Sequence, residues 1–290
     1  MDRNGEAADD LTAEVRVALA PLLEHPATTA IMTDFDGTLA AIVDDPTGAR
    51  PLDGAPEVLA QLARRFGVVA VVSGRPVSFL REHLADRGST ASPGAAVGGG
   101  AGGAPQFVGL YGLEWWRGDG VVTTDADAAG WRSTVDEVAT RLQSLAPPGA
   151  TVEPKGLAVT LHWRTAPEVQ PWAVAAGEEE AARSGLEIHP GRMSLELRPP
   201  VAVDKGTVVR QLAAGCSAAC YLGDDLGDLP AFAALATLAG EHVATVSVAA
   251  VDGESDPAVV AAADITVTGP AGALEVLRWL ARSAVPPRES

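Results

Sequence analysis

Cysteine is scarce in this sequence, which contains only Cys216 and Cys220. No second cysteine pair and no neighbouring histidine accompanies them, so a zinc site built on this pair is excluded. The two residues are therefore expected to be buried free thiols in a cytosolic protein.

Long apolar segments are also missing. No uninterrupted apolar run approaches the roughly 18 residues that a membrane-spanning helix needs. The first ten residues are acidic and lack the apolar region of a signal peptide. We therefore expect a cytoplasmic protein with no membrane partner.

Runs of basic residues are absent from a chain whose formal net charge is −17. Nucleic acids and anionic membrane surfaces attract clusters of Lys and Arg, and no stretch here contains about five or six of them in a row. The composition therefore excludes both as expected partners. An acidic protein that binds a small anion needs a few well-placed cations instead.

The chain of 290 residues suits one large core that carries an inserted module. A lead-in helix is expected over residues 11–23. In the core, the apolar stretches 31–33 and 67–75 have the composition of buried strands, and a helix over 56–65 connects them. This order predicts a right-handed βαβ unit, followed by a helix over 77–85. The fold class is therefore α/β, with a Rossmann-like parallel-sheet core.

The sequence pattern changes between residues 113 and 200, where it predicts a compact α+β module inserted into the core. Helices are expected over 127–145 and 168–184, and strands within 151–164 and over 186–188 and 193–198.

The core pattern returns at residue 201. The expected elements are a helix over 205–214, strands over 219–223, 243–248 and 265–267, and a closing helix over 271–281. Residues 88–105, nearly all Gly, Ala, Ser and Pro, are expected to form a mobile loop. We divide the chain into a lead (1–26), a core (27–112 and 201–285), the inserted module (113–200) and a tail (286–290).

Polar side chains follow several predicted core strands or begin the helix after them. Ligands of an open parallel sheet bind beyond the carboxyl ends of its strands, so these residues are expected to share one crevice. Carboxylates gathered there repel one another, and a hard divalent cation with oxygen ligands relieves that repulsion, which favours Mg²⁺ over zinc. The residues are Asp34, Asp36, Ser73, Lys205, Asp224, Asp225 and Asp228.

This set of residues suits phosphoryl transfer. If Asp34 is the nucleophile, each pair of like charges at about 4 Å costs roughly 4 kcal/mol, so Mg²⁺ and Lys205 must neutralise the site. Asp36 is close enough to protonate the leaving alkoxide and then to accept a proton from water. Ser73 and the backbone amides after Asp34 would hydrogen-bond the transferring oxygens. The residues therefore predict an aspartyl-phosphate intermediate that water hydrolyses.

Each of these residues also has a plainer interpretation. Asp34 and Asp36 could form an Asp-rich turn, and Lys205 could be a solvated helix start. Ser73 could cap the helix that begins near Pro76, a role that is compatible with phosphate binding. The residue patterns alone leave these alternatives open.

Four motifs resemble, in order and spacing, those of the haloacid-dehalogenase-like phosphatases: Asp34-Phe-Asp-Gly-Thr, Ser73-Gly-Arg, Lys205-Gly and Gly223-Asp-Asp. The resemblance implies catalytic roles for Asp34 as nucleophile, Asp36 as acid and base, and Lys205. It implies Mg²⁺ ligands at Asp34, the Asp36 carbonyl and Asp224, with Asp225 in support. The phosphate-binding positions would be Phe35, Asp36, Ser73, Gly74 and Lys205.

A finer match, over roughly residues 28–285, is to the trehalose-6-phosphate phosphatases. It implies that module 113–200 is a cap that closes over a disaccharide, and that Arg75, Glu153, Lys155 and Glu196 bind the substrate. The stretches that carry it are Ala41-Ile-Val-Asp-Asp-Pro, Gly109-Leu-Tyr-Gly-Leu-Glu, Val152-Glu-Pro-Lys, Leu161-His-Trp-Arg and Leu195-Glu-Leu-Arg-Pro-Pro.

This resemblance implies Mg²⁺-dependent hydrolysis of trehalose 6-phosphate to trehalose and phosphate, in functional pairing with a trehalose-phosphate synthase. The residues themselves agree, since Glu153 and Lys155 alternate along a strand and face one side, where they could bind a polyol or form a solvent-facing ion pair. Two other functions stay open. One is a phosphatase for another disaccharide or pseudo-disaccharide phosphate, and the other is a regulatory module that binds a sugar phosphate without catalysis.

The chain departs from the family pattern at three positions. Gly227 and Leu229 stand where the family commonly has Thr and Glu, which puts the outer shell of the metal site in question. Tyr111 stands where a His is usual. None of these departures removes a residue that the chemistry requires.

Overall fold

The computed structural model describes residues 11–43, 45–85, 103–191, 193–253 and 255–284. Its α-helices are α1 (Ala13–Leu19), α2 (Ala55–Ala63), α3 (Val77–Leu84), α4 (Ala126–Ala129), α5 (Arg132–Leu145), α6 (Gln170–Ser184), α7 (Lys205–Leu212), α8 (Leu229–Gly240), α9 (Pro257–Ala262) and α10 (Gly269–Ser283). Its strands are β1 (Thr29–Thr33), β2 (Val68–Val72), β3 (Gln106–Gly109), β4 (Glu114–Trp116), β5 (Val122–Thr124), β6 (Thr151–Pro154), β7 (Val159–His162), β8 (Glu187–Gly191), β9 (Ser194–Arg198), β10 (Ala218–Gly223), β11 (Ala244–Val251) and β12 (Ile265–Thr268).

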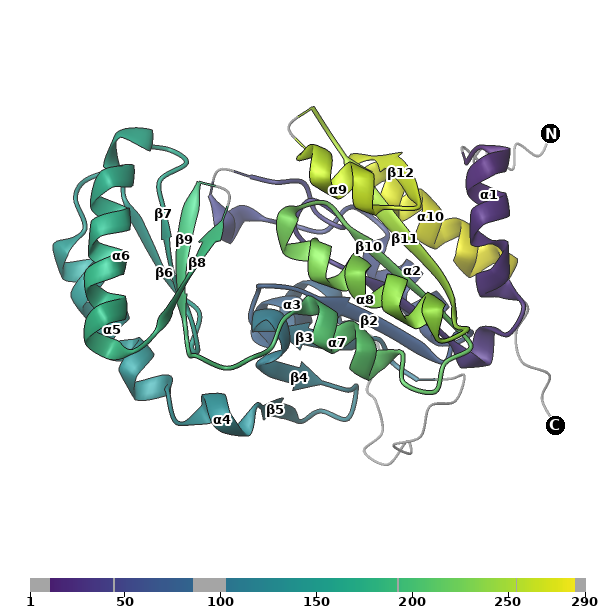
Figure 1. Ribbon diagram of the computed structural model, residues 1–290, viewed down its shortest axis with the longest axis horizontal. Helices are drawn as coiled ribbons and strands as arrows, with labels where there is room; N and C mark the ends of the chain where they lie inside the picture. Colours follow the sequence, from purple (N-terminus) through teal and green to yellow (C-terminus); the bar gives the residue numbers. More distant parts are fainter. Residues whose placement is uncertain (1–10, 44, 86–102, 192, 254, 285–290) are drawn as a thin grey trace, which may run out of the picture.

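The larger sheet has eight strands in the order β12-β11-β10-β1-β2-β3-β4-β5 (Figure 1). The strands from β12 to β3 are parallel, and β1 lies between β10 and β2, with Ile31 opposite both Cys220 and Val69. This confirms the predicted α/β class with a parallel core. Since β1 runs parallel to both neighbours, the residues after all three strands emerge at one edge.

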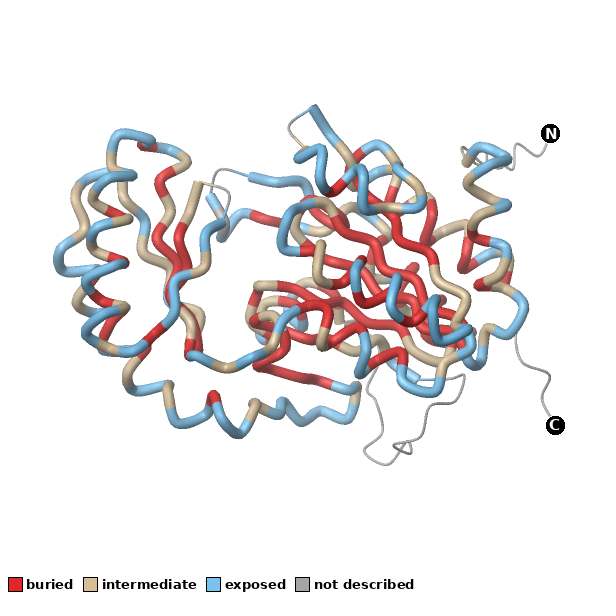
Figure 2. The backbone as a smooth tube through the Cα atoms, in the orientation of Figure 1, coloured by how far each residue is buried: buried red, intermediate tan, exposed pale blue. Residues whose placement is uncertain are grey.

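Alternating side chains of the central strands pack on opposite faces of this sheet, because strand side chains have a period of two residues. Ile31 packs in a core with residues of α2, α3 and α10, whereas Met32 packs in a second core with residues of α7 and α8. Both faces are therefore covered, which explains the continuous apolar sequence of β1 and β2. Figure 2 shows buried residues concentrated along these strands.

The antiparallel strands β4 and β5 extend the larger sheet beyond β3. The ring of Trp116 on β4 stacks on Phe107 of β3, with 5.1 Å between the ring centroids. The predicted boundary between residues 112 and 113 is therefore corrected, since residues 114–124 belong with the core sheet. β4 has only three residues, which is too short to show a strand period in the sequence.

The smaller sheet is antiparallel, in the order β6-β7-β9-β8, and α5 and α6 pack on it. It lies apart from the larger sheet, at the left of Figure 1. This α+β arrangement agrees with the expectation for the inserted module. The predicted helix over 127–145 is two helices, α4 and α5, and the predicted strand region 151–164 is the hairpin β6–β7.

Several other expectations need qualification. The lead-in segment is α1 followed by a 3₁₀ turn over Ala20–Leu23. Both cysteines are free, but Cys216 is only partly buried, unlike Cys220. Most of the Gly-rich segment 88–105 and the tail lie outside the described residues. Within the described part of the chain, no helix combines the length and the apolar character that crossing a membrane requires.

Candidate active site

Residues from three neighbouring strands and one helix meet at the carboxyl edge of the larger sheet. Asp34 directly follows β1, and its backbone N–H donates to the carbonyl of Leu222 on β10 at 2.8 Å. Ser73 follows β2 and Asp224 follows β10, while Lys205 begins α7. These residues therefore lie at one edge of the sheet, as their positions after predicted parallel strands indicate.

The carboxylate of Asp34 is buried, with a relative exposure of 5%, and lies 3.1 Å from the ammonium of Lys205. Burial raises the pKa of Asp34 well above its usual value; Lys205 opposes this shift, and Asp228 adds to it. Among the described residues, this carboxylate contacts Lys205 and caps no backbone N–H of the segment after it, so the interpretation of Asp34 as part of a capping turn is wrong. Asp34 is a buried carboxylate whose charge depends on nearby cations.

Lys205 is buried as well and forms a second ion pair with Asp228, at 2.6 Å. Burial by itself would lower the pKa of Lys205, but the charges of Asp228 and Asp34 raise it well above its usual value. The alternative of a solvated helix start is therefore wrong. Lys205 is a fixed cation beside Asp34.

Asp228 is fully buried, and both of its carboxylate oxygens accept hydrogen bonds. Its Oδ1 accepts from Lys205 and from the hydroxyl of Tyr221 at 2.7 Å. Its Oδ2 accepts from the backbone N–H groups of Asp224, at 2.9 Å, and Asp225, at 3.2 Å. The sequence pattern assigns no role to Asp228; the available signal is its position on the 3₁₀ turn that follows Asp224. Asp228 orients both Lys205 and the chain that carries Asp224.

We expect Asp228→Asn to lower the free energy of unfolding by about 2–4 kcal/mol, because a buried charge pair is broken and an amide nitrogen must face a donor. Tyr221→Phe removes only one of the donors and should cost about 1 kcal/mol. Chemical denaturation of both variants measures this difference. Equal losses in the two variants would contradict the central position of Asp228 in this network.

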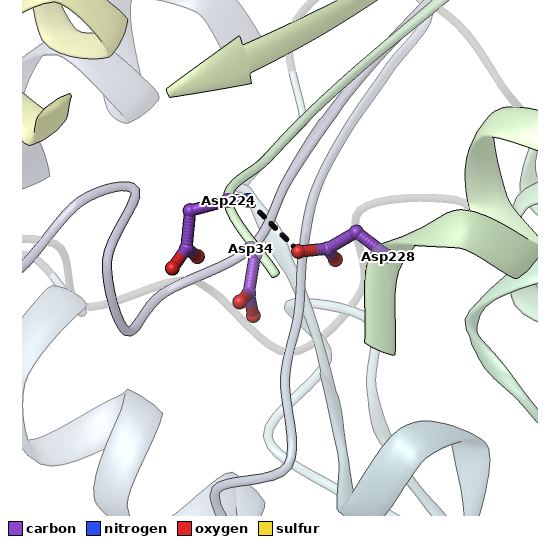
Figure 3. A group of neighbouring side chains, drawn as sticks. All are labelled: Asp34, Asp224 and Asp228. Carbon is purple, nitrogen blue, oxygen red and sulfur yellow. Dashed lines mark hydrogen bonds between the residues drawn. The ribbon is translucent and has the colours of Figure 1, made fainter. Parts of the chain in front are cut away.

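Oxygen atoms of Asp34, Asp224 and Asp228 lie within 4.8 Å of one another (Figure 3). Burial raises the pKa of Asp224 to about 9, and the charge of Asp34 adds to this shift. Both groups would be stabilised in their ionised form by a cation. Because Asp228 is already saturated with donors, the oxygens that fit a hard divalent cation are those of Asp34 and Asp224.

The backbone around Gly37 forms one side of this acidic cluster. Gly37 has φ +77°, and a Cβ atom there would lie 2.0 Å from Oδ2 of Asp224. Only glycine fits this position. Thr38 donates its hydroxyl to Oδ1 of Asp224 at 3.2 Å, so this loop holds the carboxylate in place.

Asp225, a predicted supporting ligand, does not join this cluster. It is exposed, and its carboxylate accepts a hydrogen bond from the backbone N–H of Gly227 at 2.8 Å, where it caps a short 3₁₀ turn over Leu226–Asp228. The family departure at Gly227 therefore lies in this exposed turn, where its backbone N–H binds Asp225.

Apart from Lys205, the predicted phosphate-binding residues lie in the loops that follow β1 and β2. Ser73 is buried, and its hydroxyl accepts from the backbone N–H of Arg75 at 3.2 Å. The side chain of Phe35 is buried in the core, so only its backbone could contact a phosphate.

Ser73 does not cap the helix that follows it. The N-cap of α3 is Pro76, and the carboxylate of Glu114 accepts from the backbone N–H of Val77 at 2.9 Å. The N-cap interpretation of Ser73 is therefore wrong. Sequence reasoning missed Glu114, which reaches this helix from β4.

The carboxylate of Asp36 is bound at both oxygens by the guanidinium of Arg75, at 2.7 and 2.8 Å. Arg75 is buried, and its guanidinium lies 4.6 Å from the ring centroid of Phe79. It also approaches Glu153 of the smaller sheet, at 3.8 Å. The predicted substrate-binding residue Arg75 thus connects Asp36 to the other predicted substrate-binding residues.

Those residues form a buried charge cluster on the smaller sheet. Lys155 contacts Glu196 at 3.0 Å and Glu153 at 3.7 Å. Thr160 donates to Glu196 at 2.9 Å, and His162 contacts Glu153 at 2.8 Å. Sequence reasoning gave Thr160 and His162 no individual role.

Burial raises the pKa of Glu153, but the hydrogen bond to His162 and the charge of Lys155 outweigh it and lower the pKa to about 2. The side chain of Lys155 is only 10% exposed and that of Glu196 6%. A solvent-facing ion pair is therefore excluded. The cluster offers ionised and hydrogen-bonding groups on the side of the smaller sheet that approaches Arg75.

Comparisons with known proteins point to one family. Residues 32–262 match the family model described as trehalose-phosphatase. The chain is 35% identical over 221 residues to the trehalose-phosphate phosphatase of Mycolicibacterium paratuberculosis, which covers 73% of this chain and 51% of that protein. It is also 35% identical over 213 residues to the protein of that name from Mycobacterium tuberculosis strain H37Ra, covering 70% and 50%. The chain thus spans about half the length of the curated relatives it matches.

Solved structures show the same fold. The C-terminal domain of trehalose-6-phosphate phosphatase from C. albicans superposes with a TM-score of 0.71 at 21% identity, over 93% of this chain and 97% of that one. A trehalose-6-phosphate phosphatase related protein superposes with a TM-score of 0.70, also at 21% identity, over 87% and 97%. Since the family model covers most of the sequence, this chain belongs to the trehalose-phosphatase family.

Proposed function

We propose that this chain is a phosphatase that hydrolyses trehalose 6-phosphate to trehalose and phosphate. The observation that carries the proposal is the convergence of Asp34, Lys205 and Asp224 at one sheet edge, with Asp34 buried beside a fixed cation. Family membership and the names of the relatives support the choice of substrate. A protein that only binds a phosphate has no need of a buried carboxylate directed at it.

The residues that would hold a Mg²⁺ ion are Asp34 and Asp224, together with the backbone carbonyl of Asp36. When bound, the ion would neutralise the charges of Asp34 and of the substrate phosphate, which otherwise repel each other. The raised pKa of Asp224 supports this assignment, because it reflects burial and unbalanced negative charge from Asp34.

In the first step, a carboxylate oxygen of Asp34 attacks phosphorus, and the bond between phosphorus and the sugar oxygen breaks. Lys205 and the hydroxyl of Ser73 stabilise the charge on the transferring oxygens. Asp36, in its protonated form, gives its proton to the leaving sugar oxygen. The products of this step are the free sugar and an aspartyl phosphate on Asp34.

In the second step, water attacks phosphorus and gives a proton to Asp36, and the bond from phosphorus to Asp34 breaks. Phosphate leaves and both carboxyl groups return to their starting state. In the structure, Arg75 binds both oxygens of Asp36. We therefore expect Arg75 to release at least one of them before each proton transfer.

The charge cluster on the smaller sheet supplies sugar recognition in this proposal. Carboxylates accept hydrogen bonds from sugar hydroxyls, and an ammonium donates to them. Glu153, Lys155 and Glu196 combine both kinds of group on one face. A substrate held between this face and Asp34 would be a polyol whose phosphate enters the core crevice.

The proposal is tested by measuring phosphate release from a panel of sugar phosphates at several Mg²⁺ concentrations. We expect trehalose 6-phosphate to have the highest kcat/KM. Faster turnover of another disaccharide phosphate would mean that this compound, and not trehalose 6-phosphate, is the preferred substrate. Binding of trehalose 6-phosphate without any phosphate release would instead favour a regulatory module.

Glu153→Ala should reduce kcat/KM for trehalose 6-phosphate by roughly 10- to 100-fold, because an acceptor for sugar hydroxyls is lost. Turnover of an aryl phosphate, which has no sugar, should stay within about twofold. The control is Glu168→Ala, which removes an exposed glutamate near α6 and should change the turnover of neither substrate. Equal losses on both substrates would mean that Glu153 does not contact the sugar.

Functional pairing with a trehalose-phosphate synthase follows from the proposed substrate, because that enzyme class makes it. We place both activities in the cytoplasm. Mixing a purified synthase with this chain tests whether the two also bind each other. A rate of trehalose formation that depends only on the free concentration of trehalose 6-phosphate would exclude direct transfer.

A further inference from the structure

Tyr111 has a strained backbone that is tied to the phosphate loop over 73–75. Leu110 and Tyr111 both have positive φ angles, +49° and +60°, a conformation that non-glycine residues rarely adopt. The backbone N–H of Leu110 donates to the carbonyl of Arg75 at 3.1 Å, and that of Tyr111 donates to the carbonyl of Ser73 at 3.0 Å. Strain that persists at such a place commonly serves a binding site.

The ring of Tyr111 lies between this loop and the smaller sheet. On one side it lies against Gly74, where a Cβ atom would come within 2.5 Å of the tyrosine hydroxyl oxygen. On the other side, the guanidinium of Arg198 on β9 lies 3.7 Å from the ring centroid. The hydroxyl is thus held beside the predicted phosphate-binding residue Gly74.

The hydroxyl of Tyr111 makes no hydrogen bond to any residue that the structure describes. Oε2 of Glu196 and Nε of Arg198 are buried and pair with each other at 2.7 Å. The charge of Glu196 and burial raise the pKa of Tyr111 to about 12, so its hydroxyl is a donor at neutral pH. The Tyr111 hydroxyl is therefore a donor without an acceptor among the described residues, and it lies beside the ion pair of Arg198 and Glu196.

A tyrosine hydroxyl that donates to no protein group is free to donate to a ligand, and a ligand with several hydroxyl groups would offer it an acceptor. A ligand that accepts from the Tyr111 hydroxyl must lie between residues 73–75 and Arg198 on β9. For a phosphorylated sugar, the unit that fits this place is the one that carries the phosphate, because the phosphate itself would occupy the loop.

We propose that Tyr111 is a specificity-determining residue whose hydroxyl donates a hydrogen bond to the phosphorylated sugar unit, with Arg198 holding its ring in place. This inference rests on the proposed function. Tyr111 would thus bind the sugar unit nearest to Asp34, and other residues would bind the far sugar unit.

The test compares Tyr111→Phe with the wild type on trehalose 6-phosphate and on an aryl phosphate. Phenylalanine keeps the ring and its contact with Arg198 and removes only the hydroxyl. We expect KM for trehalose 6-phosphate to rise about five- to tenfold, the effect of one neutral hydrogen bond, with kcat nearly unchanged. The aryl phosphate should show no change in either parameter.

Two controls keep a structural effect apart from a binding effect. The thermal midpoint of Tyr111→Phe should match that of the wild type. Thr237→Val, which removes an exposed hydroxyl from α8, should leave KM and kcat for both substrates unchanged.

An unchanged KM for trehalose 6-phosphate in Tyr111→Phe, or equal losses on both substrates, would overturn the proposal. If the wild type released phosphate from the aryl substrate but not from trehalose 6-phosphate, the proposed function would be wrong in its substrate. Normal wild-type turnover together with an unaffected Tyr111→Phe would reject the role of Tyr111 alone.

Discussion

Asp34→Asn is expected to reduce phosphate release by roughly 10⁴-fold or more, because the amide cannot attack phosphorus and form an aspartyl phosphate. The other parts of the site stay in place: Lys205 keeps its ion pair with Asp228 at 2.6 Å. Substrate binding should therefore survive, and trehalose 6-phosphate should still bind to the inactive variant. Steady-state kinetics and calorimetric titration measure the two effects separately.

The same substitution should leave stability unchanged or raise it by roughly 1–2 kcal/mol, since a charge leaves a cluster of like charges. The physical reason is that burial and neighbouring carboxylates raise the pKa of Asp34, which means that its ionised form is costly in the folded protein. Thermal denaturation tests this expectation.

Asp136→Asn is the matched control, because it makes the same chemical change at an exposed position on α5. It should alter neither turnover nor stability. If Asp34→Asn kept a tenth of the wild-type activity, the nucleophile would have to be another residue. If it unfolded the protein, its effect on rate would carry no information, and Asp34→Glu, which keeps the charge but shifts the carboxylate, would replace it.

Removal of divalent cations is expected to lower phosphate release to the background rate, a loss of roughly 10³-fold or more, because Asp34 and the substrate phosphate then repel each other without compensation. Adding Mg²⁺ back should restore the rate, and Ca²⁺ should not replace it equally, since the two ions differ in preferred geometry. The measurement is phosphate release after chelation and after stepwise addition of each ion.

A second effect of the metal is visible without substrate. Mg²⁺ at about 100 times its Kd should stabilise the folded protein by about 2.7 kcal/mol, which corresponds to a rise in thermal midpoint of roughly 5 °C. Asp224→Asn should remove most of this rise, whereas Asp225→Asn should keep it, because the carboxylate of Asp225 caps a turn. A rise that survives Asp224→Asn would place the metal elsewhere.

The position of Asp34 is a case in which the sequence was sufficient. Its strand is short, apolar and followed at once by carboxylates, and chain direction alone places a residue after a parallel strand at the binding edge. Ser73 and Asp224 follow neighbouring strands, and the observed pairing of β1 with β2 and β10 brings all three together. The sequence therefore predicted that these residues meet at one edge of the sheet.

The sequence could not predict which charged residues pair with each other. No local pattern indicates that Arg75 binds both oxygens of Asp36, or that Asp228 accepts from Lys205 and Tyr221. Asp36 and Arg75 are 39 residues apart and Lys205 and Asp228 are 23 apart. Such pairs form because packed elements place side chains within about 3 Å, and a polar residue in the sequence shows only that it needs some partner.

The sequence by itself determined the fold class and the set of polar residues at the carboxyl edge of the sheet, because strand periodicity and the residues at strand ends are local properties of the chain. The tertiary structure decided three further points. These are that β4 and β5 complete the core sheet, that Asp228 positions Lys205, and that Tyr111 lies between the loop over 73–75 and Arg198. Each depends on contacts between segments far apart in the chain, and their geometry is set by how whole elements pack.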